Sequence, residues 1–163
     1  MKILTVDDDD LALAMLNQSL VQSGYQVESA SNGQDALKML ETGSFRIVIT
    51  DWEMPLMNGL ELCQAIRERQ TTGYTYVILL TAHTNSKEVI KGLSVGADDF
   101  VTKPFDPTEL LMRVKVGHRI IGLETRDVAI FAMAKLAESR DPETGAHLER
   151  IRKYCLALSK WLS

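Results

Sequence analysis

The sequence has little cysteine, no long apolar run and no excess of basic residues. Only two of its 163 residues are cysteine, Cys63 and Cys155, and both have apolar helical neighbours, which favours buried thiols over a disulfide or a metal site. No apolar stretch approaches the roughly 18 residues that span a bilayer. No secretory signal pattern follows Met1. We therefore expect a cytoplasmic protein with no membrane partner.

The charge balance argues against direct binding of nucleic acid. The chain has 18 Lys and Arg against 22 Asp and Glu, which gives a formal net charge of -4. Phosphate backbones are bound through an excess of positive charge, and this composition offers none. An apolar fraction of 45% is ordinary for a globular protein, so we expect one well-buried domain with an appendage.

Apolar runs alternate with amphipathic stretches along the first 120 residues. The runs are KILTV, YQVESA, RIVIT, YVILL and DDFVT, and helical spacing follows them over residues 11–22, 34–41, 60–67, 87–95 and from 108 onward. Such alternation predicts an α/β protein whose parallel sheet is covered on both faces. At this length we expect a flavodoxin-like, doubly wound sheet of five strands in the order 2-1-3-4-5.

The helical pattern continues beyond the point where a small domain would close. Apolar positions persist through Ile120, Ile121 and Leu123, a second helical segment is expected over residues 126–139, and an apolar stripe covers residues 148–162. We therefore divide the chain into a domain over residues 1–120 and an α-helical extension over residues 121–163. The exposed apolar positions should be covered either by a second chain or by the helices that follow.

Polar residues stand where four of the predicted strands end. Asp7 and Asp8 follow the first run, Asp51 the third, Thr81 the fourth and Lys103 the fifth. The carboxyl ends of parallel strands share one edge of the sheet, so these side chains should meet in one pocket. Clustered carboxylates suit Mg²⁺, while a hydroxyl and an ammonium can contact a phosphoryl group. The pattern predicts phosphoryl transfer onto an aspartate.

Part of the acidic run has a simpler interpretation. Asp residues are favoured at the start of a helix, where they accept hydrogen bonds from free backbone N–H groups. We assign that role to Asp9 and Asp10 and keep Asp7 and Asp8 for the metal.

Five ordered motifs resemble the bacterial response-regulator receiver domain over about residues 1–120. They are Val6-Asp7-Asp8, Asp51 with Met54-Pro55 and Asn58-Gly59, Thr81-Ala82, Gly96-Ala97, and Lys103-Pro104-Phe105. The resemblance implies a phosphoacceptor of a two-component system, which a sensor histidine kinase or a phosphotransfer protein phosphorylates. Apart from possible self-dephosphorylation, such a domain is not an enzyme. It also allows for a homodimer.

The resemblance assigns a role to each motif residue. Asp51 would be the phosphoacceptor, and Mg²⁺ would be held by Asp7, Asp8 and Asp51 together with the backbone carbonyl of Glu53. Lys103 would pair with the phosphoryl group, and the peptide bond before Pro104 would be cis.

Two further residues would transmit the signal in such a domain. Thr81 would donate a hydrogen bond to the phosphoryl group and move toward it. Phe100, three residues before the lysine, would then turn as the switch aromatic.

The last part of the chain resembles the opening of an HD-GYP domain, a metal-dependent cyclic di-GMP phosphodiesterase. The similarity runs from Asp127 to Tyr154, and Glu143 and His147 match a pair that can join the metal site of that family. The His-Asp pair and the Gly-Tyr-Pro motif are absent from these 163 residues. We expect a truncated output domain that cannot form that active site.

Two other functions remain open at this stage. Asp8 and Asp10 form an Asp-x-Asp arrangement, as in aspartate-nucleophile phosphatases of the haloacid-dehalogenase type, and Asp98-Asp99 could supply the later acidic pair. Asp51 and Lys103-Pro104 argue against that enzyme. An interaction module that works without phosphorylation is the other alternative.

Overall fold

The computed structural model describes residues 1–69, 73–82, 92–138 and 152–153. Its strands form one parallel sheet of five in the order β2-β1-β3-β4-β5, which confirms the predicted doubly wound, flavodoxin-like fold. The strands are β1 (Lys2–Val6), β2 (Gln26–Ala30), β3 (Ile47–Asp51), β4 (Tyr76–Thr81) and β5 (Asp99–Thr102).

The burial of each strand follows its place in the sheet. The three central strands, β1, β3 and β4, are buried almost throughout, and their sequences are nearly continuous apolar runs. The edge strand β2 alternates with polar residues and is largely exposed. The register places Asp51 opposite Leu80 and Thr81 opposite Thr102, so the carboxyl ends of β3, β4 and β5 lie together.

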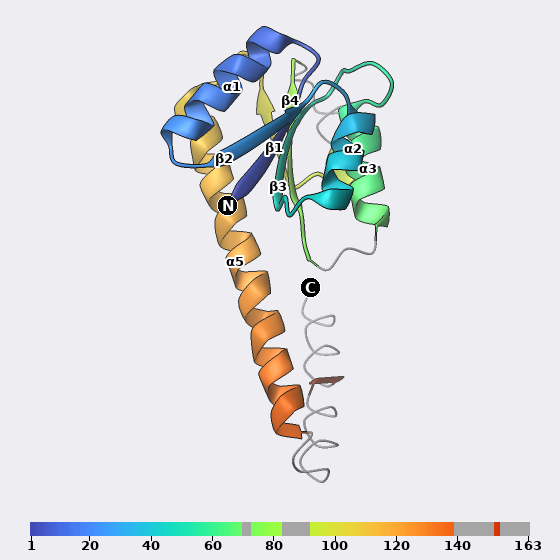
Figure 1. Cartoon of the computed structure of the whole chain (residues 1–163), viewed down its shortest axis with the longest axis vertical. Helices are drawn as coiled ribbons and strands as arrows, with labels where there is room; N and C mark the ends of the chain where they lie inside the picture. The colour runs from blue at the N-terminus through green and yellow to red at the C-terminus, as the bar shows by residue number, and fades with distance from the viewer. Residues whose placement is uncertain (70–72, 83–91, 139–151, 154–163) are drawn as a thin grey trace. The chain divides into compact units, whose positions relative to one another are not determined.

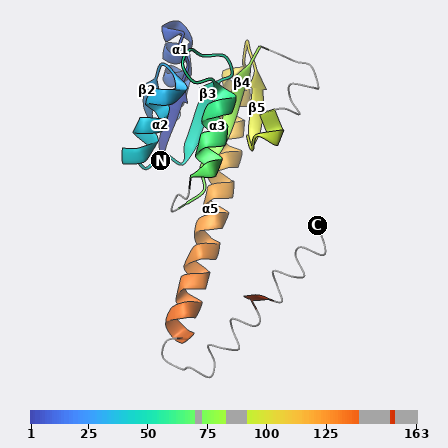
Figure 2. The same ribbon diagram turned by 90° about the vertical axis from the view of Figure 1, so that its right-hand side faces the viewer.

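Helices cover both faces of the sheet. They are α1 (Asp10–Gln22), α2 (Gly33–Thr42), α3 (Gly59–Glu68) and α5 (Pro107–Glu138). Figure 1 shows α1 and the first part of α5 on one face, with α2 and α3 on the other, and Figure 2 shows the same layers from the side. Most of the helix expected over residues 87–95 lies outside the described residues.

Side chains that accept backbone N–H bonds fix the start of the first three helices. Asp9 caps α1 and accepts hydrogen bonds from Leu11 N at 2.8 Å and Ala12 N at 3.4 Å, which confirms the interpretation of Asp9 as a helix cap. Asn32 caps α2 and Asn58 caps α3. The chain leaves α1 through Gly24, whose φ of 85° is in the left-handed region that glycine tolerates best.

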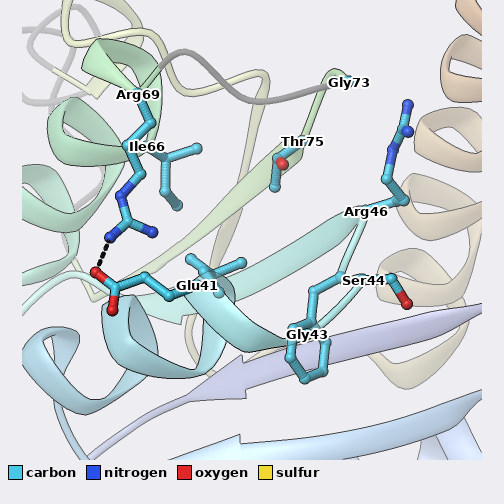
Figure 3. A pocket seen from close by; sticks show the side chains of 10 residues that line it. Glu41, Gly43, Ser44, Arg46, Ile66, Arg69, Gly73 and Thr75 are labelled. Atoms are coloured by element: carbon cyan, nitrogen blue, oxygen red, sulfur yellow. Dashed lines mark hydrogen bonds and ion pairs between the residues drawn. The ribbon is translucent and has the colours of Figure 1, made fainter.

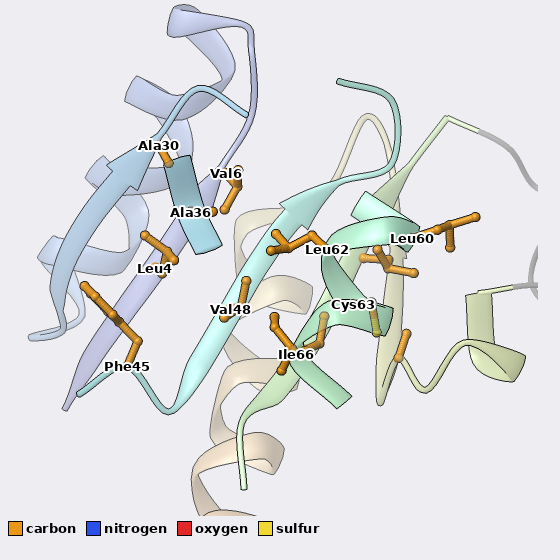
Figure 4. Close-up of a cluster of buried hydrophobic side chains, with 13 residues drawn as sticks. Leu4, Val6, Ala30, Ala36, Phe45, Val48, Leu60, Leu62, Cys63 and Ile66 are labelled. Atoms are coloured by element: carbon orange, nitrogen blue, oxygen red, sulfur yellow. The ribbon is translucent and has the colours of Figure 1, made fainter. Parts of the chain in front are cut away.

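Two buried clusters hold the layers together, one on each face. The cluster beneath α2 and α3 contains Leu4, Val48 and Leu62 and is drawn in Figure 4. It also contains Cys63, whose thiol donates to the carbonyl of Val95 at 3.6 Å. Burial raises the pKa of Cys63 to about 11. This cysteine is therefore a protonated core residue, as the sequence predicts.

The opposite cluster anchors α5 to the sheet. Leu110, Val114 and Ile121 of α5 are buried in it. The expectation that Ile121 needs a cover from a second chain or a later segment is therefore wrong, because the domain itself covers it. Ile120 and Leu123 remain exposed, at 38% and 53%.

Helix α5 continues further than the sequence suggests. It is one helix through Glu138, where we expected a separate segment to begin at residue 126. The chain forms two compact units, Met1–Ile121 and Gly122–Ser163. In the second unit, the guanidinium of Arg152 lies over the ring of Phe131, 5.0 Å from its centroid. The stripe expected over residues 148–162 lies almost entirely outside the described residues.

A cavity of about 400 Å³ opens where β3 and β4 begin, at the sheet edge opposite the strand-end aspartates. Among the residues that line it, Figure 3 shows the side chains of Arg69 and Glu41 pointing toward each other, with Nη2 of Arg69 2.5 Å from Oε1 of Glu41. The opposite charges of Arg69 and Glu41 therefore offset each other. Among the described helices, none is long and apolar enough to span a bilayer.

Candidate functional site

The structure brings together the aspartates that end β1 and β3. One carboxylate oxygen from each of Asp7, Asp8 and Asp51 lies within 4.8 Å of the others. Asp7 is buried, Asp51 is half-buried and Asp8 is exposed, so the group opens to solvent on one side. Asp7 and Asp8 are adjacent in the chain and lie more than 40 positions before Asp51, so the parallel sheet is what brings the two segments together.

Lys103 links two of these aspartates. Its Nζ lies 2.7 Å from Oδ2 of Asp7 and 2.8 Å from Oδ1 of Asp51. The side chains of both aspartates are largely shielded from solvent, at 2% and 14% exposure. In such surroundings an ammonium stabilises two nearby carboxylates far more than it would at an open surface.

The pKa values of Asp51 and Lys103 reflect the opposing effects of burial and of nearby charges in this site. Burial raises the pKa of Asp51, the Lys103 ammonium partly opposes that effect, and the negative charge of Asp7 adds to it. Burial alone would lower the pKa of Lys103, but its hydrogen bonds to Asp51 and Asp7 outweigh this, so the pKa is raised. Lys103 is therefore a permanent cation beside the half-buried Asp51.

Backbone hydrogen bonds between neighbouring strand ends position these side chains. Trp52 N donates to Leu80 O at 2.9 Å, and Lys103 N donates to Thr81 O at 2.7 Å. The Lys103-Pro104 peptide is cis, as the resemblance implies. Asp7 Oδ1 accepts a hydrogen bond from Asp9 N at 3.0 Å, which orients that carboxylate.

The segment after Asp51 is held by residues whose role the sequence analysis did not assign. Gly59 N donates to Trp52 O at 3.0 Å, and a Cβ at Gly59 would stand only 2.1 Å from Asp51 O. The next helix begins with a capping box, in which Asn58 and Glu61 each accept the other's backbone N–H. The Asn-x-x-Glu spacing of Asn58 and Glu61 in the sequence could have indicated this capping box.

Thr81 and Phe100, the two residues of the switch hypothesis, lie on the neighbouring strands β4 and β5. Thr81 is buried at the end of β4, one residue beyond the partner of Asp51. Phe100 lies on β5, paired with Leu79, and its partly buried ring packs against the α2 and α3 cluster. Glu53 is exposed two residues after Asp51. Glu143 and His147 lie outside the described residues.

The donor set fits a hard divalent cation. Carboxylate oxygens converge from three residues, one face is open for water or a phosphoryl oxygen, and Mg²⁺ prefers such oxygen ligands. Repulsion among the carboxylates also favours binding of a cation.

Comparison with known families identifies the family of this domain. The model of the response regulator receiver domain matches residues 3–115. This chain belongs to that family. Receiver domains are phosphoacceptors rather than typical enzymes and bind Mg²⁺ at an acidic pocket. Membership therefore favours the receiver over the haloacid-dehalogenase type of phosphatase.

Curated relatives match this receiver over the same region. The alkaline phosphatase synthesis transcriptional regulatory protein PhoP of Bacillus subtilis is 39% identical over 114 residues, covering 70% of this chain and 47% of the relative. The transcriptional regulatory protein PcoR of Escherichia coli is 39% identical over 115 residues, covering 70% and 50%. The receiver chain spans about half the length of these relatives.

Solved receiver structures share the fold. The chemotaxis response regulator CheY4 of Vibrio cholerae has 34% identity and a TM-score of 0.67, covering 71% of this chain and 97% of that one. The signal receiver domain of an HD domain-containing protein from Pseudomonas fluorescens has 28% identity and a TM-score of 0.70, covering 77% and 91%.

Proposed function

We propose that Asp51 accepts a phosphoryl group from the phosphohistidine of a sensor histidine kinase or a phosphotransfer protein. The observation that carries this proposal is the placement of Lys103, whose ammonium contacts both Asp7 and Asp51. A carboxylate beside a fixed cation is suited to attack a negatively charged phosphoryl group, because part of the repulsion is already offset.

The residues act mainly through position and charge. An oxygen of Asp51 bonds to phosphorus while the bond from phosphorus to the donor imidazole nitrogen breaks, and the electron pair leaves with the imidazole. The attacking group is already a carboxylate, so no general base is needed. Lys103 offsets charge on the phosphoryl oxygens, and the hydrogen bond to Asp9 N keeps Asp7 oriented.

Asp7, Asp8 and Asp51 would hold Mg²⁺, with the carbonyl of Glu53 completing the protein ligands. The bound ion would supply charge neutralisation at the phosphoryl oxygens. The convergence of the three carboxylates supports this assignment.

Thr81 and Phe100 would change position in response to phosphorylation of Asp51. Thr81 donates a hydrogen bond to the new phosphoryl oxygen, and the ring of Phe100 turns into the space beside it. The position of Thr81 at the end of β4 and the packing of Phe100 on β5 support this route. A coupling of about 1–3 kcal/mol between the site and this face is sufficient.

We assign residues 1–120 to the receiver and residues 121–163 to the helical start of an output domain. The matched relative from Pseudomonas fluorescens is the receiver of an HD domain-containing protein, which supports an output of HD-GYP type and a cyclic di-GMP phosphodiesterase in the parent protein. Glu143 and His147 would be metal ligands in that longer protein.

Self-association of the chain belongs to the same proposal. Ile120 and Leu123 of α5 are exposed apolar side chains close to the buried Ile121, and a second copy would cover them.

Acetyl phosphate with Mg²⁺ tests the acceptor. We expect one acyl phosphate that maps to Asp51, is labile in base and is absent from Asp51→Asn, whereas Asp10→Asn, an exposed first-turn residue of α1, remains phosphorylated. Modification mapped to Asp8, or to a Ser or Thr, would refute the assignment. Full control of the partner by Asp51→Asn would instead support the interaction module that works without phosphorylation.

A further inference from the structure

The peptide group that follows Asp51 is held at both ends. Its N–H, from Trp52, donates to Leu80 O at 2.9 Å. Its C=O, from Asp51, accepts a hydrogen bond from the hydroxyl of Thr50 at 3.0 Å. The first bond continues the pairing of β3 with β4, whereas the second comes from a side chain of β3 itself. Thr50 therefore helps to fix the plane of the peptide that is attached to the Cα of Asp51.

Thr50 lies in an apolar part of the sheet. Its exposed fraction is 0%, and its strand partners are Val6 on β1 and Leu79 on β4. Side chains alternate between the two faces of a strand, so Thr50 shares the face of Val48, which belongs to the cluster beneath α2 and α3. Burying a hydroxyl in such surroundings is unfavourable unless it makes a hydrogen bond. The hydrogen bond to the carbonyl of Asp51 compensates for this burial.

The same carbonyl has little room to move. A Cβ at Gly59 would stand 2.1 Å from Asp51 O, so the backbone of Gly59 lies against that oxygen. Gly59 is buried at the start of α3, and its N–H donates to Trp52 O at 3.0 Å. The Thr50 hydroxyl thus directs the carbonyl of Asp51, and the start of α3 limits its displacement.

The orientation of this peptide affects the acceptor carboxylate. Turning the plane of the Asp51–Trp52 peptide changes the ψ angle of Asp51 and therefore the direction of its side chain relative to the segment that follows. The carboxylate has close neighbours that depend on this direction. Its Oδ1 is 2.8 Å from Nζ of Lys103, and one of its oxygens lies within 4.8 Å of oxygens of Asp7 and Asp8. A misplacement of about 1 Å at a reacting group can cost roughly a hundredfold in rate.

We propose that Thr50 is a positioning residue for phosphoryl transfer. Its hydroxyl holds the carbonyl of Asp51, and this keeps the carboxylate of Asp51 beside Lys103 and directed for attack on phosphorus. In this role Thr50 contacts neither the phosphoryl group nor the metal. The inference rests on the proposed function of Asp51 as the acceptor.

Three substitutions separate the hydroxyl of Thr50 from the shape of its side chain. Thr50→Val keeps the shape and removes the hydroxyl, Thr50→Ala removes the hydroxyl and the methyl group, and Thr50→Ser keeps the hydroxyl. With acetyl phosphate at saturating Mg²⁺, we expect Thr50→Val and Thr50→Ala to form the acyl phosphate about tenfold more slowly than the natural chain. Thr50→Ser should stay within about twofold of the natural rate. Mass spectrometry of the intact chain over time gives these rates.

The matched control is Thr75→Val, which makes the same change at the opposite edge of the sheet. Thr75 is also buried, at 8% exposure, and directly precedes β4. Its substitution should leave the phosphorylation rate unchanged. All rates are measured at a temperature at which thermal unfolding shows each variant to be folded, so that a loss of stability alone does not slow the reaction.

The carbonyl ¹³C resonance of Asp51 reports the hydrogen bond itself. A donor polarises the carbonyl that it bonds, so Thr50→Val should shift this resonance. Thr50→Ser and Thr75→Val should leave it in place. A slow Thr50→Val variant with an unshifted resonance would show that the rate depends on something other than this hydrogen bond, and would overturn the inference.

The remaining outcomes separate this inference from the proposed function. Folded Thr50→Val and Thr50→Ala variants that react at the natural rate would overturn the positioning role and leave Asp51 as the acceptor. An equal loss of rate in Thr50→Ser or in Thr75→Val would also overturn it, because the hydroxyl at this place would not be the cause. If neither Thr50→Val nor Thr50→Ala folds, the hydroxyl serves the fold and the inference fails. A phosphoryl group that maps to another residue of the natural chain would overturn the proposed function and this inference with it.

Discussion

The guanidinium of Arg67 is 2.6 Å from the carboxylate of Asp98, measured from Nη2 to Oδ2. Arg67 also donates to Gly96 O and to Thr75 O, each at 2.7 Å. Asp98 accepts a further hydrogen bond from Val77 N at 2.7 Å. This one contact therefore joins the end of α3, the start of β4 and the turn before β5.

Loss of Arg67 should destabilise the receiver. The side chains of Arg67 and Asp98 are only 24% and 14% exposed, so Arg67→Ala leaves a shielded carboxylate and two carbonyls without their donor. We expect the free energy of unfolding to fall by about 2–4 kcal/mol, measured by urea denaturation. Lys38→Ala is the control, because its pair with Asp35 is exposed to solvent and should contribute little to stability. Equal urea midpoints for Arg67→Ala and Lys38→Ala would contradict a stabilising role of the contact between Arg67 and Asp98.

Two tyrosines should make the receiver sensitive to alkaline pH. Burial, with the hydrogen bond and charge of Asp98, raises the pKa of Tyr74 from 10.0 to about 12, and burial with the charges of Asp99 and Asp98 does the same for Tyr76. Between pH 10 and about 12, the unfolded chain loses the phenol protons of both tyrosines, whereas the folded chain keeps them. The free energy of unfolding should therefore fall as pH rises from 10 to about 12.

Thermal unfolding across this pH range checks that expectation, together with phenolate absorbance of the folded protein. Tyr74→Phe should make the loss of stability less steep. A stability that stays constant through the window would show that the two phenols are not perturbed.

Mg²⁺ should bind before phosphorylation and depend on Asp8. Trp52 adjoins Asp51, so its fluorescence in a Trp161→Phe background should report a titration with the ion. Asp8→Ala should weaken binding at least about tenfold, since one of three oxygen ligands is removed. Asp10→Ala, in the first turn of α1, should leave the titration unchanged. Identical curves for the natural chain and Asp8→Ala would remove Asp8 from the metal site.

A methyl group at Gly59 should disturb the acceptor. Its Cβ would stand 2.1 Å from Asp51 O, a backbone atom that can yield only by moving the end of β3. We expect Gly59→Ala to lower the free energy of unfolding by about 1–3 kcal/mol and to slow phosphorylation by acetyl phosphate.

Gly122→Ala is the matched control for this substitution. No atom lies within 4 Å of a Cβ at Gly122, which is in the interior of α5, so the change should raise stability by about 0.5–1 kcal/mol. Phosphorylation of Gly59→Ala at the natural rate would show that the contact does not position Asp51.

The sequence predicts the sheet and the location of the site because both depend on local patterns. Apolar runs mark the strands, and Asp51 and Lys103 stand directly after two of them. The second contact of Lys103, with Asp7, depends on side-chain direction and could not be predicted. Arg67 was missed because its partner lies 31 residues away, across a turn that no spacing rule specifies.

The continuity of α5 was missed for a different reason. Residues 124–127 are polar, and in a sequence a short polar stretch resembles a linker. Helix propensity carries the chain through it, since no glycine or proline occurs between Gly122 and Glu138.

Lys103 gives the acidic site its own internal counterion. Because its ammonium offsets part of the charge at Asp7 and Asp51, these two carboxylates lie close together before any metal binds. A metal that binds this prepared site would stabilise the folded chain by mass action, so its supply would affect the stability of the domain as well as its readiness for phosphoryl transfer.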